Sequence, residues 1–332
     1  MKKFTFLNHA SFINESEKAI LMCDPWFEGS AFNNGWSLLT EDNNNDVVIN
    51  FLKKKNKPIY IWYSHEHSDH FSVNFINSAS KLGLTFEVIY KETIDKRLLN
   101  FFIKKNIKVN LVSKKKPVFK IDDKISISVY EFSYKEKNTD DSFALIQHDQ
   151  FKFLNLNDCT INTSADIEFI KKKINYSNID ILFSQFSYAG FCEPKNSSED
   201  RLRVSYKIIE KTEELIYRLN PNLYVPFASF IYYSHLRNYH MNDQFNHPEK
   251  FLKNIKNKKN KDKISFIKPF KSYELDLHII KNILKDKSDA NKYWSDKFNN
   301  VKNFKIQNLK NINYQYKFEE LNKSYLLFLK KI

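Results

Sequence analysis

Three histidines and one aspartate lie within six consecutive residues, in the run HEHSDH at positions 65–70. Side chains two positions apart in an extended segment point the same way, so His65 and His67 can approach one metal ion. Asp69 and His70 follow directly and can reach a second ion beside the first. Nitrogen and carboxylate-oxygen ligands in this mixture suit borderline metals such as zinc and iron. The spacing therefore predicts a metal centre with two ions.

A predicted strand precedes this histidine-rich run, and a predicted helix follows it. Residues 58–63 (PIYIWY) are β-branched and aromatic without a charged break, which is typical of a strand buried on both faces. Directly after the run, Phe71, Phe75 and Ala79 recur at helical spacing. A chance histidine cluster in a polar turn is the competing interpretation, and the position between a buried strand and a helix argues against it.

The remaining elements predict the architecture. A strand at 125–130, a hairpin at 143–156, a helix at 167–174, a strand at 179–183, a helix at 199–219 and a strand at 223–227 follow in order. This order predicts an αββα sandwich, in which two mixed β-sheets pack face to face with helices outside. We expect a catalytic domain over residues 1–250 and a basic C-terminal extension over 251–332, which begins with a lysine-rich run at 253–263 that is typical of an exposed linker.

The unbroken H-x-H-x-D-H motif resembles the signature of the metallo-β-lactamase superfamily, and the resemblance covers about residues 1 to 245. In that family the first two histidines bind one metal ion, and the aspartate and last histidine bind the other. The resemblance therefore implies that His65 and His67 hold the first ion and that Asp69 and His70 hold the second. It implies two divalent ions as cofactors, with zinc expected first and iron as the alternative.

Two later residues are candidates for the rest of the ligand set. Asp158 follows the apolar stretch 151–156, where the family places a carboxylate that bridges both ions; an ordinary turn aspartate is the alternative. The last ligand of the family is a histidine after a late strand. We expect it to be His235, with His240 and His247 as rivals. Asp69, Asp158 and His235 are then the residues expected to take part in catalysis.

One expected ligand is missing. The family supplies a further histidine to the first ion, between the signature and the bridging aspartate. The only histidine in that interval is His148, in an apparent hairpin turn. Asp140, Asp141 and Glu131 are possible substitutes. The departure leaves open the identity of the metal and whether the chemistry is hydrolysis.

Two short motifs point to the small-molecule branch of the superfamily. Asn8-His9-Ala10-Ser11 and Cys23-Asp24-Pro25-Trp26, with the segments 23–38 and 229–243, look most like the catalytic half of the CMP-N-acetylneuraminate hydroxylases. In that resemblance His9 and Asp24 line or support the site, although a buried histidine and a turn aspartate are equally ordinary interpretations.

Three functions are compatible with these motifs. The first is a metal-dependent hydrolase, in which the ions lower the pKa of a bridging water that attacks a phosphodiester, lactone or nucleotide-sugar. The second is a non-haem iron oxygenase that resembles the sialic-acid hydroxylases. Those enzymes also carry a Rieske domain with paired Cys-x-His and Cys-x-x-His motifs, and this sequence contains none. The third is a metal-dependent nuclease.

The composition of the sequence bears on the substrate, on membrane association and on the location of the protein. The net charge is +14, from 53 lysines and arginines against 39 acidic residues, which permits binding to nucleic acid, anionic lipid or a phosphorylated substrate. A solvated basic surface is the alternative interpretation, because the lysines are scattered. We expect a small anionic substrate, and nucleic acid is the weaker candidate because no added nucleic-acid module is seen. No apolar run is long enough to span a membrane. Three widely spaced cysteines are typical of reduced thiols, so we expect a cytoplasmic protein.

Overall fold

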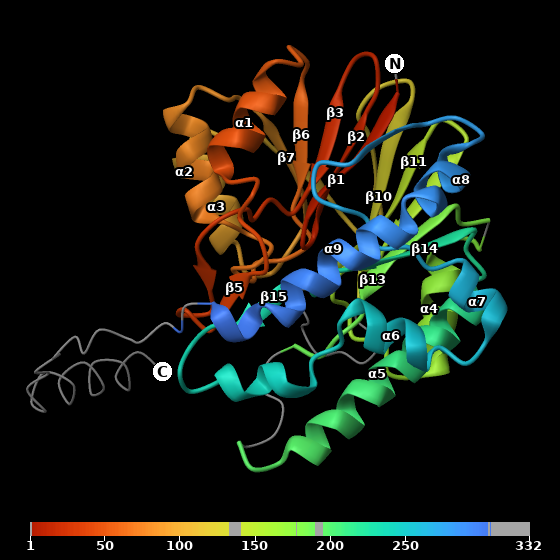
Figure 1. The fold of residues 1–332 in the computed structure, drawn as a ribbon. Coiled ribbons are helices and arrows are strands. Elements are labelled where there is room, and N and C mark those ends of the chain that lie inside the picture. Colours follow the sequence, from red (N-terminus) through yellow and green to blue (C-terminus); the bar gives the residue numbers. More distant parts are fainter. Residues whose placement is uncertain (1, 133–140, 177, 190–194, 305, 307–332) are drawn as a thin grey trace, which may run out of the picture.

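The computed structural model describes residues 2–132, 141–176, 178–189, 195–304 and 306. Over these ranges the chain forms two large β-sheets packed face to face, with helices on the outer face of each (Figure 1). The αββα sandwich of two mixed sheets predicted from the order of elements is therefore confirmed.

The first sheet has seven strands. From edge to edge they are β16 (Ser272–Glu274), β1 (Lys3–Asn8), β2 (Ser11–Glu15), β3 (Ile20–Cys23), β6 (Ile59–Trp62), β7 (Glu87–Lys91) and β8 (Val109–Val112). The strands from β3 to β8 are parallel, and the others pair antiparallel. Because β3 and β6 are parallel neighbours with Cys23 opposite Trp62, the residues that follow them emerge side by side.

The second sheet has six strands and is also mixed. From edge to edge they are β14 (Leu223–Phe227), β13 (Ile181–Gln185), β12 (Phe151–Asn155), β11 (Ser142–His148), β10 (Ile125–Glu131) and β9 (Val118–Lys120). β12, β13 and β14 are parallel, so the loops that follow them meet at one end of the sheet. A small third sheet, β15 (Ile231–Tyr233), β5 (Trp36–Leu38) and β4 (Ser30–Ala31), lies apart.

Phenylalanine fills the space between the two large sheets. Phe12 of the first sheet stacks on Phe183 of the second, with ring centroids 4.7 Å apart. Phe4 contacts the same ring, and Phe227 lies against both Phe6 and Phe12. Each buried phenylalanine contributes about 1.5–3 kcal/mol to folding, so this layer holds the sheets in register and fixes the ends of their strands relative to one another.

Helices cover both outer faces. α1 (Asn45–Lys53), α2 (Val73–Lys81) and α3 (Arg97–Lys104) lie beside β6 and β7, and α4 (Ser164–Lys173) and α5 (Ser198–Leu219) lie on the side of the second sheet (Figure 1). α2 begins at Ser72, whose hydroxyl accepts a hydrogen bond from the backbone N–H of Phe75. This cap starts the helix two residues after the histidine-rich run. None of the helices in the described ranges is long and apolar enough to cross a lipid bilayer.

The described part of the C-terminal extension packs against the rest of the chain. It contains the end of α6 (Pro248–Asn254) and all of α7 (Lys258–Asp262), β16, α8 (Ile279–Lys285), α9 (Lys287–Asn299) and the short 3-10 helix η2 (Val301–Asn303). A further 3-10 helix, η1 (Tyr239–Gln244), precedes α6. The lysine-rich run is therefore not a linker: it includes α7, and Ile255 within it is buried. The boundary at residue 250 remains a prediction, and residues 307–332 of the extension lie outside the described ranges.

Candidate metal centre

The histidine-rich run forms a tight loop between β6 and α2. The backbone N–H groups of His70 and Phe71 both donate to the carbonyl of His67, at 3.0 and 2.7 Å. This turn buries three of the candidate ligands, because His65, Asp69 and His70 are at most 2% exposed. His67 remains exposed. One side of the loop thus faces the protein interior and the other faces solvent.

Ligand atoms from this loop gather with those of other segments into three overlapping groups. Within each group the atoms lie within 4.8 Å of one another. The groups are His65 with His67 and Asp141, His65 with His70 and Asp158, and His9 with Asp69 and His70. Because the groups share His65 and His70, they form one continuous cluster that is consistent with a dinuclear metal site.

Asp158 lies where the two halves of this cluster meet. It follows β12, and its Oδ2 lies 3.6 Å from Nε2 of His65 and 3.5 Å from Nε2 of His70. Nε2 of His65 is also 2.9 Å from Nδ1 of His67. One carboxylate thus approaches an imidazole of each predicted ion site, which is the position that a bridging ligand needs.

Asp24 supports the cluster from behind. Its Oδ2 accepts hydrogen bonds from Nδ1 of His70 at 3.0 Å, from the hydroxyl of Ser64 at 2.6 Å and from the amide of Asn157 at 3.0 Å. Its Oδ1 accepts from the backbone N–H of Ser64 at 2.8 Å. Sequence reasoning named Asp24 but missed Ser64 and Asn157. Both adjoin candidate ligands in the sequence, which is the only signal that marks them.

These hydrogen bonds fix the tautomers of two histidines. Nδ1 of His70 donates to Asp24, so Nε2 of the neutral ring keeps its lone pair. The hydroxyl hydrogen of Ser64 is donated to Asp24, so the Ser64 oxygen accepts from Nδ1 of His65 at 2.9 Å. Nε2 of His65 therefore also keeps its lone pair. Both lone pairs lie on the side of the ring that faces Asp158.

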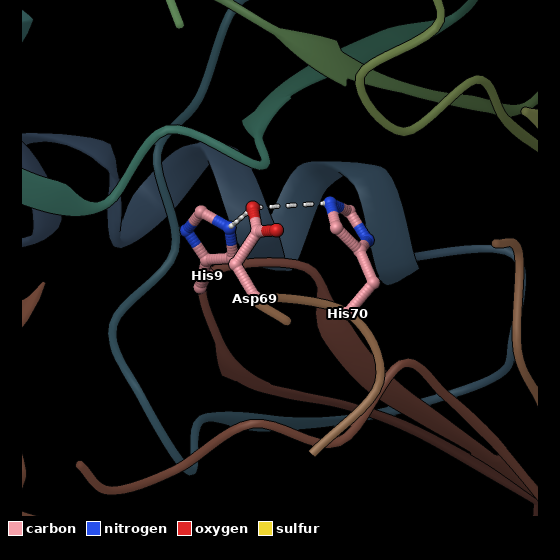
Figure 2. A group of neighbouring side chains, drawn as sticks. All are labelled: His9, Asp69 and His70. Atoms are coloured by element: carbon pink, nitrogen blue, oxygen red, sulfur yellow. Dashed lines mark hydrogen bonds and ion pairs between the residues drawn. The ribbon is translucent and has the colours of Figure 1, made fainter. Parts of the chain in front are cut away.

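His9 occupies a different position in the cluster. Its Nε2 lies 3.3 Å from Oδ2 of Asp69, and the same oxygen lies 3.4 Å from Nε2 of His70 (Figure 2). The backbone N–H of Phe230 donates to Nδ1 of His9 at 3.3 Å, so a neutral His9 ring carries its hydrogen on Nε2. His9 thus donates to Asp69, although its nitrogen lies close enough to the cluster to bind an ion.

The late histidines lie outside the three groups. Among the described residues, no group of candidate ligands includes His235, whose Nδ1 accepts from the backbone N–H of Arg237 in the turn after β15. His240 and His247 line a separate cavity. The loop that follows β14 instead contacts His9, because the N–H of Ala228 donates to the His9 carbonyl at 2.9 Å. The ligand role of His235 stays a prediction.

Of the two substitutes for the missing histidine that the structure describes, Asp141 joins a group and Glu131 does not. Glu131 forms an ion pair with Lys114 at 2.8 Å, and Asp140 lies outside the described residues. His148 is the last residue of β11, fully buried, with its Nδ1 3.4 Å from the side-chain oxygen of Asn14. Within the described ranges, the third side chain beside His65 and His67 is therefore a carboxylate.

The electrostatics of the cluster favour a cation. Burial lowers the pKa of His65 and of His9. Burial also opposes protonation of His70, but Asp69, Asp158 and Asp24 outweigh it and raise the pKa of His70 well above its usual range. Burial and the nearby charge of Asp158 raise the pKa of Asp141. The carboxylates thus create a negative potential that divalent ions neutralise better than protons do.

Unpaired buried atoms show that the cluster fits metal ions. Oδ1 of Asp69, Nε2 of His70 and Oδ1 of Asp158 are buried, and none of them has a hydrogen-bond partner among the described residues. A buried polar atom without a partner lowers the stability of the fold by about 1–3 kcal/mol. Three such atoms in one cluster therefore indicate that a ligand binds there. The two carboxylate oxygens carry lone pairs, as does Nε2 of the neutral His70 ring, and a metal ion is a partner that accepts them.

A cavity of about 790 Å³ opens beside the cluster. His67, Asp141 and Asp158 line it on the metal side. Other parts of its wall come from β5, from the loop after β12 and from α5. This volume is in the range of cavities that bind drug-sized molecules.

The fold and the site define a class of protein. No family model matches the sequence. A possible metal-dependent hydrolase from Veillonella parvula superposes with a TM-score of 0.58 at 14% identity, and the match covers 83% of this chain and all of that one. The diiron β-hydroxylase CmlA from Streptomyces venezuelae superposes with a TM-score of 0.55 at 12% identity, over 82% of this chain and 54% of that one. The chain has the metallo-β-lactamase fold.

The sequence also has curated relatives. It is 22% identical over 245 residues to the cytidine monophosphate-N-acetylneuraminic acid hydroxylase of Danio rerio, and the Xenopus laevis protein of that name is 21% identical over 243 residues. Each match covers 70% of this chain but only 38% of the relative. The chain is a distant homologue of these hydroxylases and spans well under half of their length.

Proposed function

We propose that this chain is a dinuclear non-haem iron oxygenase that hydroxylates a small anionic molecule. The observation that carries the proposal is the donor set beside the cavity, where His65 and His67 meet Asp141 within 4.8 Å. Two histidines and one carboxylate with open positions are typical of non-haem iron(II) oxygenases. A zinc hydrolase with this signature has a third histidine in place of the carboxylate.

Six side chains of the three groups are candidates to hold two ions. His65, His67 and Asp141 would hold the first ion, Asp69 and His70 the second, and Asp158 would bridge them. Three of these six ligands are carboxylates, so the site has more oxygen ligands than a histidine-rich zinc site, and its ligands are harder in the hard–soft sense. Iron bound there would supply the activation of dioxygen. Asp24 and Ser64 orient the imidazoles of His70 and His65, and His9 holds the carboxylate of Asp69.

The overall reaction converts a substrate C–H bond into C–OH. It consumes one dioxygen, two electrons and two protons, and it releases one water. The 332 residues contain no paired Cys-x-His and Cys-x-x-His motifs, so the two electrons come from a reductant outside this sequence. The names of the curated relatives and of the diiron β-hydroxylase support hydroxylation as the reaction class.

Metal analysis tests the proposal directly. We expect protein purified without added metal to contain about two iron atoms per chain and to consume oxygen when a chemical reductant is supplied. Asp141→Asn keeps the size of the side chain but removes its charge, and it should lower both the iron content and the oxygen consumption. Protein that holds zinc alone and hydrolyses substrates under anaerobic conditions would refute the oxygenase.

Hydrolysis is the second candidate function. The similarity to the possible metal-dependent hydrolase of Veillonella parvula favours it, because that match covers the whole of the other chain. In this alternative two zinc ions would lower the pKa of a shared water, and Asp158 would fix their separation. Zinc content together with turnover that does not depend on oxygen would distinguish this function from the first.

A further inference from the structure

Two lysines of α5 line the cavity beside the metal cluster. Lys207 and Lys211 are one helical turn apart, so their side chains lie on the same face of the helix. Like charges at this spacing repel each other and destabilise a helix. Within the described ranges, neither ammonium lies within ion-pair distance of a carboxylate, whereas Arg203 and Arg218 of the same helix each have an acidic partner there.

Lys211 is held toward the cavity. It is half-buried, and its Nζ donates to the side-chain oxygen of Asn162 at 2.7 Å. Burial and the charge of Lys207 lower the pKa of Lys211, and the charge of Asp166 opposes this shift. The two lysines therefore add positive charge to a cavity whose metal side is lined by Asp141 and Asp158.

The loop after β12 links these lysines to the metal cluster. Asp158 lies in the cluster and Asn162 lies beside Lys211, and both line the cavity. Four Cα-to-Cα steps separate these two residues, so their Cα atoms lie at most about 14 Å apart. Lys211, which is hydrogen-bonded to Asn162, and the carboxylate of Asp158 therefore line neighbouring parts of one cavity, which Lys207 also lines. The wall of this cavity is largely apolar, with Trp36, Ile161 and Leu215 among its residues.

We propose that Lys207 and Lys211 bind a phosphate group of the substrate, while an apolar part of the same molecule reaches the metal cluster. Two ammonium groups match the double charge of a phosphate monoester better than the single charge of a carboxylate. The substrate class is therefore an organic phosphate short enough to reach from these lysines to the metal cluster within this one cavity. This inference rests on the proposed function only for the position of the reacting atoms.

Binding of phenyl phosphate to the metal-loaded protein tests this site. The test variant is Lys207→Gln with Lys211→Gln, and the matched control is Lys172→Gln with Lys173→Gln, two exposed lysines of α4 outside the cavity. Both pairs remove two positive charges. We expect calorimetric titration to show at least about tenfold weaker binding in the test variant and less than about twofold in the control, because charge-assisted hydrogen bonds are lost only in the former.

Further measurements separate the site from its alternatives. The metal content and the melting temperature of the test variant should equal those of the wild type, which shows that only the lysines were changed. Benzoate should bind more weakly than phenyl phosphate and lose less affinity in the variant. An unchanged affinity for phenyl phosphate would place the phosphate on the metal ions and overturn the inference, as would equal weakening in the control. Binding is measured without turnover, so the role of the two lysines can be tested even if the protein proves to be a zinc hydrolase.

Discussion

Nδ1 of His70 donates a hydrogen bond to Oδ2 of Asp24 at 3.0 Å, and neither side chain is exposed to solvent. The same oxygen accepts from Ser64, which in turn accepts from His65. One carboxylate at the end of β3 thus determines the tautomer of two candidate metal ligands at the end of β6. Such a carboxylate raises the basicity of the imidazole and fixes the direction of its lone pair.

Asp24→Ala should weaken metal binding by about 10- to 100-fold, because His70 and Ser64 lose their common acceptor. Competition with a chromophoric chelator measures the affinity. Asp24→Asn is the milder variant, since its amide oxygen can still accept from His70, and it should lie between the alanine variant and the wild type. If both variants bind metal like the wild type, the contact has only a structural role.

Asp141→His should raise the ratio of zinc to iron in protein purified without added metal. A third imidazole makes the first ion site resemble the histidine-rich sites of zinc enzymes. The same substitution at the exposed Asp123 should leave the ratio unchanged. Elemental analysis of the three proteins provides the measurement. An unchanged ratio in Asp141→His would mean that Asp141 is not a ligand of the first ion.

His9→Ala should lower the affinity of the second ion about tenfold, because Asp69 loses the hydrogen bond that holds its carboxylate. Gln at this position can still donate from its side-chain amide, so His9→Gln should recover part of the loss. Metal titration of these variants beside His235→Ala compares the two histidines. A severe effect of His235→Ala with a mild effect of His9→Ala would instead support the ligand role of His235 that the sequence suggests.

The sequence predicts the metal loop and the sandwich because both depend on local patterns. The strand at 58–63 and the helix after the loop follow from side-chain type and spacing, and the structure has β6 and α2 there. The hairpin and the strand at 223–227 also agree with β11, β12 and β14.

The rest of the site depends on contacts between distant segments. Asp141 is one of three equivalent carboxylates in the sequence, and only the pairing of β11 with β10 and β12 brings it beside His65. Likewise, no local pattern shows that Phe230 contacts His9, because the two residues are 221 positions apart. The lysine-rich run has the composition of a linker, but the packing of Ile255 and α7 overrides that tendency.

His148 should make the protein less stable in mild acid. Burial lowers its pKa from 6.5 to about 4 in the folded chain. Below pH 6.5 the unfolded chain therefore binds a proton that the folded chain does not, so stability falls as the pH falls toward 4. Between pH 7.5 and 5 this amounts to about 2 kcal/mol.

His148→Gln cannot titrate, so its free energy of unfolding should fall less over this pH range than that of the wild type. Urea unfolding at the two pH values measures the difference. His278→Gln, at an exposed position, is the control and should follow the wild type. A His148→Gln variant with the same acid sensitivity as the wild type would show that other groups cause the loss.

The C-terminal extension should be needed for the stability of the site. Trp294 of α9 is fully buried, its ring lies 4.1 Å from that of Phe230, and its Nε1 donates to the carbonyl of Ile267 at 2.8 Å. The backbone of Phe230 in turn holds His9. Trp294→Ala should therefore lower the free energy of unfolding by about 3–5 kcal/mol. It should also lower the affinity for the second metal ion.

Truncation after residue 250 should have a larger effect, because it removes β16 from the edge of the first sheet as well as Trp294. Thermal unfolding and metal analysis of the truncated protein, of Trp294→Ala and of the exposed control Tyr217→Ala measure both effects. We expect the control to match the wild type, since its ring is 70% exposed and little packing is lost. A truncated protein that stays folded with its full complement of metal would instead establish residues 1–250 as an independent catalytic domain.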